Sequence, residues 1–177
     1  MRFATGRALR GVMVVDWDNL EINLRLGEGE VNEASIISGF DRVAKKIARK
    51  FGRIVMAFVL LPPQPAYIWG ETLSRLGFYP VVCSKVKDKK SGEETDTVDA
   101  TLIRLGQKLI GNIRDLSFLC LVSGDGDFSL FLREVEHRGL KIVVVAASVN
   151  SLSSELIDLA DDTFLFEIKP TNKEGGR

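Results

Sequence analysis

Two clusters of acidic residues each follow directly after a run of apolar residues. The first run leads into Asp16 and Asn19, and the second leads into Ser123, Asp125 and Asp127. An apolar run that breaks off into acids and glycines is typical of a buried parallel strand with polar groups at its carboxyl end, where open α/β sheets bind their ligands. Two such strands predict one shared acidic pocket.

A third connection adds Asp96, in the first turn of a predicted helix. Taken one at a time, the acids have ordinary explanations as helix caps or turn residues. Taken together, they would repel one another unless a cation lay between them. Carboxylate oxygens favour a hard cation, so the pattern predicts Mg²⁺ or Mn²⁺. The predicted metal ligands are Asp16, Asp96, Asp125 and Asp127.

A polyanionic ligand would need a local basic patch, because 24 Lys and Arg residues balance 24 Asp and Glu residues over the chain. The polar connection 85–94 is predicted to be a loop beside the acids, and lysine contacts to phosphate give affinity that does not depend on sequence. Its lysines are Lys85, Lys87, Lys89 and Lys90. A second basic run, at 45–53, falls on an amphipathic helix and is interpreted as a solvent-facing surface.

Three aromatic residues also follow predicted strand ends. They are Trp17, Tyr67 and Trp69. Two interpretations stay open for them: they pack against the protein, or they stack on unpaired bases.

The remaining reactive residues narrow the class of function. His137 is the one histidine and lies near a predicted helix end, far from the acids, so histidine-based catalysis is not expected. Cys83 and Cys120 lie inside apolar runs, as reduced, buried cysteines of intracellular proteins do. No apolar stretch approaches the roughly 18 residues that span a bilayer, and the basic N-terminus lacks a secretory signal's apolar segment. We therefore expect a cytoplasmic protein without a membrane partner.

Strand-like and helix-like patterns alternate along the chain. Strands are predicted at 11–15, 53–61, 79–84, 117–122, 141–147 and 163–168. Helices are predicted at 32–51, 66–76, 95–111, 128–138 and 152–160. Asn32 is expected to cap the first helix and Thr95 the third, and Gly52 to end the first. A polar connection rich in Gly and Glu precedes Asn32.

This alternation predicts an α/β fold with three layers, α/β/α. The central layer would be a Rossmann-like parallel sheet of about five to six strands with helices on both faces. One domain is expected at 11–168, between an N-terminal segment at 1–10 and a polar tail at 169–177. Parallel strands end at the same edge of the sheet, so the acids and the lysine loop should meet there.

In this arrangement the motifs resemble those of NYN domains, specifically the DUF88/LabA-like group of the PIN-like nuclease superfamily. The resemblance rests on Asp16-x-x-Asn19, on Thr95-Asp96-x-x-Asp99, and on the more specific Ser-Gly-Asp-Gly-Asp-Phe at 123–128. It runs in order from about residue 11 to residue 167 and implies a PIN-like fold. The function it implies is that of a metal-dependent ribonuclease of the endoribonuclease type, with RNA as its partner.

By the same resemblance, Asp16, Asp96, Asp125 and Asp127 would be the catalytic acids, with Asn19 and Ser123 as supporting groups that bind substrate. The chain departs from the family pattern at Leu102, where many members carry a further acid. Asp99 lies three residues after Asp96 on the same helix face and is the supporting acid that would substitute for it. Many PIN-like domains are dimers, so a homodimer is an open alternative here.

Two other function classes remain as alternatives. A PIN-like module that binds RNA or protein without catalysis would keep the fold but use metal weakly. A haloacid-dehalogenase-type phosphatase would use Asp16 as nucleophile, because Asp16-Trp17-Asp18 resembles its Asp-x-Asp motif. That match fails at Leu20 and at 128–129, and a dinucleotide-binding loop is disfavoured because its third glycine is missing.

Overall fold

Six parallel strands form the central sheet of this computed structural model, which describes residues 9–28, 31–87, 94–95 and 97–168. The strand order across the sheet is β3-β2-β1-β6-β7-β8. The strands are β1 (Arg10–Asp16), β2 (Arg53–Leu61), β3 (Tyr79–Val82), β6 (Phe118–Val122), β7 (Lys141–Ala146) and β8 (Asp162–Leu165). The predicted parallel α/β sheet is confirmed.

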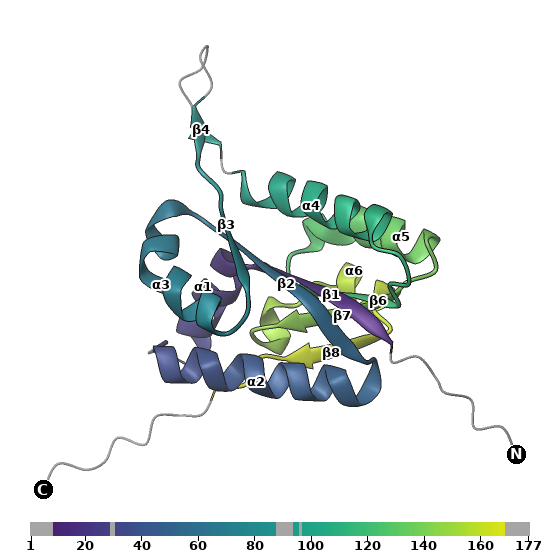
Figure 1. The fold of residues 1–177 in the computed structure, drawn as a ribbon. Helices are drawn as coiled ribbons and strands as arrows, with labels where there is room; N and C mark the ends of the chain where they lie inside the picture. Colours follow the sequence, from purple (N-terminus) through teal and green to yellow (C-terminus); the bar gives the residue numbers. More distant parts are fainter. Residues whose placement is uncertain (1–8, 29–30, 88–93, 96, 169–177) are drawn as a thin grey trace, which may run out of the picture.

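Helices cover both faces of this sheet (Figure 1). One face carries α1 (Trp17–Glu28), α2 (Glu33–Lys50) and α3 (Pro63–Arg75). The opposite face carries α4 (Val98–Asn112), α5 (Ser129–His137) and α6 (Ser154–Leu159). Short 3₁₀ helices lie at Gly126–Phe128 (η1) and Val149–Ser151 (η2). Within the described residues, no helix is both long and apolar enough to cross a membrane.

The side chains of β1 alternate between two hydrophobic cores. Met13 and Val15 pack toward the layer of α1, α2 and α3, whereas Val12 and Val14 pack toward the layer of α4, α5 and α6. All four are buried because β1 is a central strand covered on both faces. By the same alternation, Asp16 is directed to the α4 side at the carboxyl end of β1.

The strand order reverses between β1 and β6. The chain adds β2 and β3 on one side of β1 and then crosses over through α4 to add β6 on the other side. In open α/β sheets, ligands bind at the carboxyl ends of the two strands that flank such a reversal. The structure therefore places the ends of β1 and β6 at the location that this fold class uses for binding.

Local sequence signals account for the elements that were predicted most closely. Asn32 caps α2 through its side chain, which accepts a hydrogen bond from the Ser35 backbone N–H at 2.9 Å, and the Ser35 hydroxyl accepts one from the Asn32 N–H at 3.1 Å. Gly52 then has φ +117°, a conformation that favours glycine at a helix end. The next strand, β2, has the predicted bounds.

Three predictions about local structure were wrong. The Gly- and Glu-rich connection before Asn32 begins as a helix, α1, whose residues Trp17, Leu20 and Leu24 are buried at helical spacing. The ends of the lysine loop form an antiparallel pair of strands, β4 (Val86–Lys87) and β5 (Glu94–Thr95), and Figure 1 shows that β4 projects away from the body of the protein. Thr95 lies in β5, so the residue that precedes α4 is Thr97.

Candidate functional site at the carboxyl ends of β1 and β6

Asp16 is the last residue of β1 and immediately precedes α1. Its carboxylate Oδ1 accepts a hydrogen bond from the Asn19 backbone N–H at 3.3 Å, in the position of a helix N-cap. Its Oδ2 accepts one from the Ser123 hydroxyl at 3.1 Å, across to the loop after β6. Asp16 therefore joins the ends of the two strands between which the strand order reverses.

The Asp16 carboxyl is buried, with 5% of the residue exposed. Burial raises the pKa of Asp16 from an ordinary 3.8 to about 6, although the hydrogen bonds from Asn19 and Ser123 act in the opposite direction. The negative charges of Asp99 and Asp18 raise the pKa further. No Lys or Arg of the described residues forms an ion pair with Asp16. Its charge would be stabilised by any cation that bound beside it.

The loop after β6 is held to the loop after β1 by side chains of both. The Asn19 side-chain oxygen accepts a hydrogen bond from the Gly124 N–H at 3.0 Å. The Ser123 hydroxyl, which donates to Asp16, also accepts from the Asp125 N–H at 3.2 Å. Asn19 and Ser123 thus fix the relative position of the two acid-bearing loops, and each is partly or fully buried in doing so.

A third loop closes the same edge from the side of β7. A Cβ atom on Gly124 would lie 1.7 Å from the backbone oxygen of Ser151, so only glycine allows this approach. The Gly124 carbonyl accepts a hydrogen bond from the Ser153 N–H at 3.0 Å. Ser148 and Ser151 cap each other in a reciprocal pair that shapes this third loop. The sequence places this connection at the same edge but gives no sign of the close contact with Gly124.

Asp125 and Asp127 lie at the start of η1. The Asp125 Oδ1 accepts a hydrogen bond from the Asp127 N–H at 2.9 Å, so Asp125 acts as an N-cap in the way that its ordinary explanation predicts. The Asp125 side chain is partly buried, and Asp127 is exposed. Capping uses one carboxylate oxygen of Asp125, and the second is available to another ligand.

The first turn of α4 contributes Asp99, whose side chain is exposed. Its charge acts on Asp16, which shows that the beginning of α4 faces the end of β1. Asp96 lies outside the described residues, so its predicted role as a ligand stays a prediction. Of the two acids predicted near this helix start, Asp99 is the one that the structure relates to the site.

The lysines predicted to bind substrate are described only in part. Lys85 is exposed, in the connection that follows β3. Lys87 lies in β4, and Lys89 falls outside the described residues. Because β3 is separated from β1 by β2, this connection begins two strands away from Asp16. Its proximity to the acids stays a prediction.

The structure settles the two interpretations of the tryptophans in favour of packing. Trp17 is fully buried and Trp69 nearly so, with ring centroids 5.4 Å apart. Both indole N–H groups donate to Glu21, Trp17 at 2.7 Å and Trp69 at 3.3 Å. Arg25 holds the same carboxylate in an ion pair. This cluster joins α1 to α3 and leaves no ring face for a base, whereas Tyr67 is 92% exposed.

The donor set at this edge consists of oxygen atoms. Within the described part of the chain, no three Asp, Glu, His or Cys side chains form a ready-made metal cluster. Mg²⁺ does not need one, because it is commonly bound by one or two carboxylates and keeps several water molecules. Asp16 is a buried carboxylate that has no ion-pair partner among the described residues and lies near the negative charges of Asp99 and Asp18, which fits such an ion in its chemistry.

A family model described as the NYN domain matches residues 11–168, which include Asp16, Asn19 and the whole loop after β6. The fold is similar to the crystal structure of a protein of unknown function from Vibrio parahaemolyticus, with a TM-score of 0.74 and 20% sequence identity. The alignment covers 93% of this chain and 97% of that one. No curated protein matches the chain.

Proposed function

The chain belongs to the NYN domain family, and from this premise we propose that it is a metal-dependent ribonuclease. NYN domains are PIN-like domains of the nuclease type, and the matched segment spans nearly the whole described chain. We place it in the DUF88/LabA-like group because of the Ser-Gly-Asp-Gly-Asp-Phe motif at 123–128. The proposed reaction is hydrolysis of an RNA phosphodiester bond with Mg²⁺ or Mn²⁺ as cofactor.

The observation that carries this proposal is the environment of Asp16. A carboxyl that is 5% exposed, near the charges of other acids and without an ion-pair partner among the described side chains, is costly to ionise in a folded protein. Proteins place perturbed acids of this kind at functional sites, where a bound ion or substrate supplies the missing interaction. The location between β1 and β6 is the one where this fold class binds ligands.

Each residue has a distinct role in the proposed site. A bound Mg²⁺ or Mn²⁺ would lower the pKa of a water molecule and neutralise charge on the scissile phosphate. Asp16 and Asp125 would hold the ion directly, and Asp96, Asp127 and Asp99 directly or through water. Ser123 orients the Asp16 carboxylate through its hydroxyl, and Asn19 fixes the loop after β6 by accepting from Gly124. Lys85, Lys87 and Lys89 would contact RNA phosphates.

A cleavage assay tests this proposal. Purified wild-type protein and the variants Asp16→Asn and Asp125→Asn would be incubated with labelled RNA in Mg²⁺, Mn²⁺ or EDTA. We expect cleavage by the wild type in either metal, loss of cleavage in EDTA, and loss of most activity in both variants. Equal cleavage by all three proteins would refute the assignment of the site.

The non-catalytic alternative is separated by metal binding. The single observation in its favour is that the described acids do not form a ready-made cluster of three. Mn²⁺ titration followed by isothermal calorimetry should show binding to the wild type and weakened binding to Asp16→Asn. Tight binding of RNA without cleavage, and Mn²⁺ uptake that Asp16→Asn does not change, would instead identify an RNA-binding module.

A further inference from the structure

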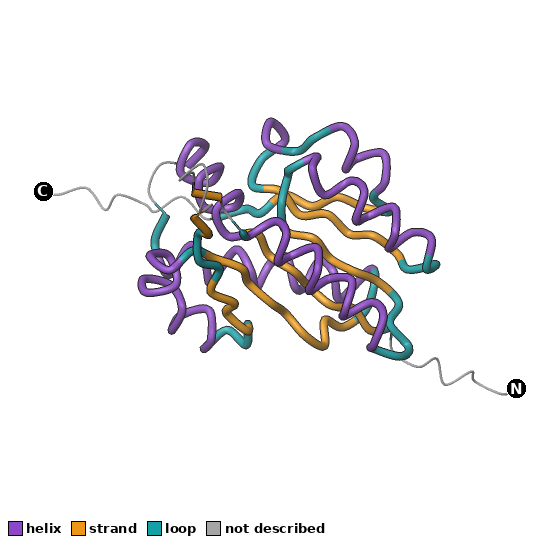
Figure 2. Tube along the Cα trace, turned by 90° about the horizontal axis from the view of Figure 1, so that it is seen from above, coloured by secondary structure: helices purple, strands orange, loops and turns teal. Residues whose placement is uncertain are grey.

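Among the residues that the structure describes, no helix covers part of the central sheet on the α4 side. Figure 2 shows α4 crossing the sheet diagonally, with β2 and β3 beside it and no helix over them. On this open face, Phe58 of β2 lies opposite Tyr79 of β3, and their rings are 5.3 Å apart at 32°. Tyr79 is 56% exposed, Met56 is 39% exposed, and Phe58 is partly buried. The face is therefore an aromatic and apolar surface open to solvent.

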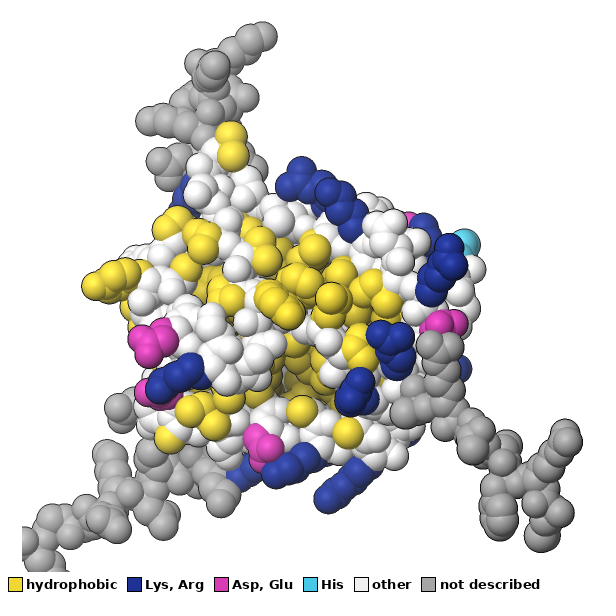
Figure 3. Space-filling view, viewed as in Figure 1, with side chains coloured by type: hydrophobic (Ala, Val, Ile, Leu, Met, Phe, Trp, Pro, Cys, Tyr) yellow, Lys and Arg dark blue, Asp and Glu magenta, His cyan; other side chains and the backbone are white. Residues whose placement is uncertain are grey.

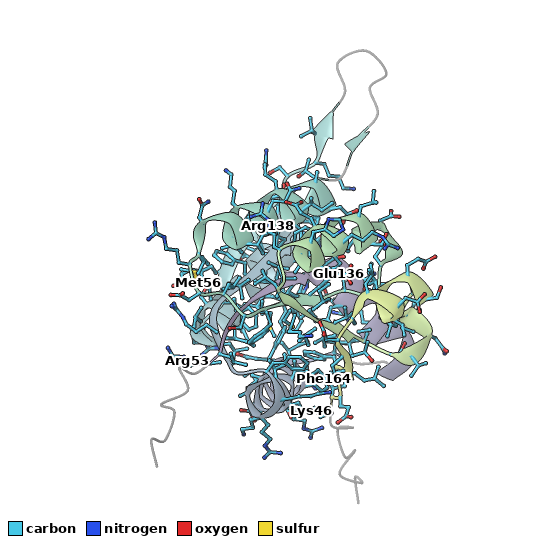
Figure 4. All side chains as sticks on the ribbon, turned by 90° about the vertical axis from the view of Figure 1, so that its right-hand side faces the viewer. Lys46, Arg53, Met56, Glu136, Arg138 and Phe164 are labelled. Atoms are coloured by element: carbon cyan, nitrogen blue, oxygen red, sulfur yellow. The ribbon has the colours of Figure 1, made fainter. Side chains whose placement is uncertain are left out.

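Basic side chains border this open face. Arg104 and Lys108 are exposed on α4 and have no ion-pair partner among the described residues. Arg53, at the start of β2, is likewise exposed, and Figure 4 shows it on the same side of the molecule as Met56. Figure 3 shows a broad hydrophobic area with Lys and Arg side chains above it and to its lower right.

Three lysines of α2 differ from the cations of α4 because each is paired with an acidic side chain. Lys45 pairs with Asp41 at 2.6 Å, Lys46 with Glu167 at 3.1 Å and Lys50 with Asp162 at 2.6 Å. On α4 the sole acid is Asp99, in the first turn. The cations of α4 therefore keep a positive potential that these three lysines of α2 have largely lost.

Arg104 and Lys108 of α4 lie along the direction of the proposed catalytic acids. The α4 helix begins at the carboxyl edge of the sheet, where Asp99 acts on Asp16, and it runs back across the sheet from there. At a rise of 1.5 Å per residue, Arg104 lies about 7.5 Å and Lys108 about 13.5 Å along the helix axis from Asp99. A nucleic-acid strand that followed these cations toward the start of α4 would reach the proposed catalytic acids.

We propose that the open face of β2 and β3 is a binding track for single-stranded RNA, with bases stacked on Tyr79 and Phe58 and phosphates held by Arg104 and Lys108. This inference rests on the proposed ribonuclease function and extends it to a substrate class, the unpaired strand. Stacking on an exposed ring needs a base whose faces are free, and a base-paired helix does not offer one.

The charge of α4 favours RNA over a second copy of this chain as the occupant. In a two-fold dimer, the same patch meets itself. The α4 helix supplies no acid beyond Asp99 to such an interface, so its cations would lose water without gaining an opposite charge from the partner's α4. A polyanion with exposed bases satisfies both the cations and the rings.

Binding measurements on the full chain test the track. An Asp16→Asn background prevents cleavage, and fluorescence anisotropy would follow a labelled 12-nucleotide uridine RNA and a duplex of the same length. Tyr79→Ala should weaken binding of the single strand about tenfold, and Tyr79→Phe should retain it, because the ring is what stacks. The duplex should bind more weakly than the single strand to the parent protein.

The cations are tested by the salt dependence of binding. Arg104→Gln with Lys108→Gln should flatten the plot of log K against log salt by roughly 1.4, the value for two phosphate contacts on a single strand. The matched control, Lys45→Gln with Lys46→Gln on α2, removes two charges and should leave the slope unchanged. Equal slopes for the two double variants would overturn the track.

The outcomes separate this inference from the proposed function. If the wild-type protein cleaves RNA but the Tyr79 and α4 variants bind like their parent, the track is wrong and the ribonuclease stands. If binding follows the expected pattern but no RNA is cleaved, the track stands and the ribonuclease fails. If Tyr79→Ala converts a dimer into a monomer in sedimentation and leaves RNA affinity unchanged, the face joins two copies of the chain and the track is refuted.

Discussion

Asp16 and Asp161 are two carboxylates that join neighbouring segments at opposite ends of the sheet. Asp161 precedes β8, and its carboxylate accepts from the Ile142 backbone N–H at 2.8 Å and from the Lys141 ammonium at 2.6 Å. Asp16 ends β1 and accepts from the Asn19 N–H at 3.3 Å and the Ser123 hydroxyl at 3.1 Å. Both make one backbone and one side-chain hydrogen bond, but only the partner of Asp161 carries a positive charge.

Their pKa values move in opposite directions. For both residues burial raises the pKa, and for Asp16 it prevails and brings the pKa to about 6. For Asp161, which is far less buried, the hydrogen bonds of Lys141 and Ile142 and the charge of Lys141 outweigh burial and lower the pKa. Lys141 thus compensates the negative charge of Asp161. No described cationic side chain does this for Asp16, at the strand reversal, so a bound ligand would have to supply the positive charge. The difference identifies Asp16 as a candidate functional residue.

The strongest test of this comparison is cleavage of RNA by Asp16→Asn and Asp161→Asn. Asparagine keeps the size of each side chain but removes the charge. The Asp16 variant should lose at least about 100-fold in activity, because an ion held by the site would lose a direct ligand. The Asp161 variant should stay within about twofold of the wild type. Similar losses in both would remove the distinction between the two acids.

The rigidity of the carboxyl edge provides the next test. Gly124→Ala would place a Cβ 1.7 Å from the Ser151 backbone oxygen, so one of two hydrogen-bonded loops must move. We expect a loss of about 2–3 kcal/mol in the free energy of unfolding, measured with urea. Gly126→Ala is the matched control in the same loop, where the nearest atom is a serine hydroxyl at 3.2 Å. Equal stability of the two variants would show that the Gly124 contact is not a constraint.

The sequence allowed this edge to be located because strand ends are local signals. The apolar runs before Asp16 and Ser123, and the rule that parallel strands end at one edge, were enough to predict that the two loops meet. Similarly, Asn32 and Gly52 marked the ends of α2 because capping depends on a few neighbouring residues. These features needed no knowledge of distant contacts.

Features set by distant contacts could not be predicted. The helix α1 was missed because Asp16 to Asn19 resembles a polar turn, and the helical pattern rests on only three buried apolar residues, Trp17, Leu20 and Leu24. The exposure of Tyr79 depends on where the crossover helix α4 lies over the sheet, which periodicity does not encode. The contact of Gly124 with Ser151 likewise depends on the packing of two loops 27 residues apart in the chain.

The pH dependence of the free energy of unfolding tests the contrast between Asp16 and Asp161. Between about pH 4 and pH 6 the unfolded chain has released the Asp16 proton while the folded chain still holds it, so the folded state loses stability as pH rises. Asp16→Asn removes this penalty. In metal-free buffer, the variant should exceed the wild type by about 1–3 kcal/mol at pH 7.5 and match it near pH 4. The measurement is urea unfolding across that range.

The control for this prediction is added metal. Mg²⁺ that binds the folded wild type should restore its stability at pH 7.5, whereas it should leave Asp16→Asn nearly unchanged. A wild type more stable than the variant at pH 7.5 without metal would contradict the assignment of an uncompensated charge at Asp16.

The smallest effect is expected at Asp161, with the opposite pH dependence. Its pKa is lowered in the folded state, so its contribution to stability is present above the ordinary pKa of an aspartate and is lost as pH falls through the folded value. Because Lys141 is largely exposed, the pair is screened by water, and Asp161→Asn should cost no more than about 1 kcal/mol at pH 7.5. Urea unfolding of this variant should show the cost decreasing at low pH and in high salt. Asp16→Asn is expected to gain stability at neutral pH. The same gain in Asp161→Asn would mean that Lys141 does not compensate the charge of Asp161, and that the contrast between the two acids has another cause.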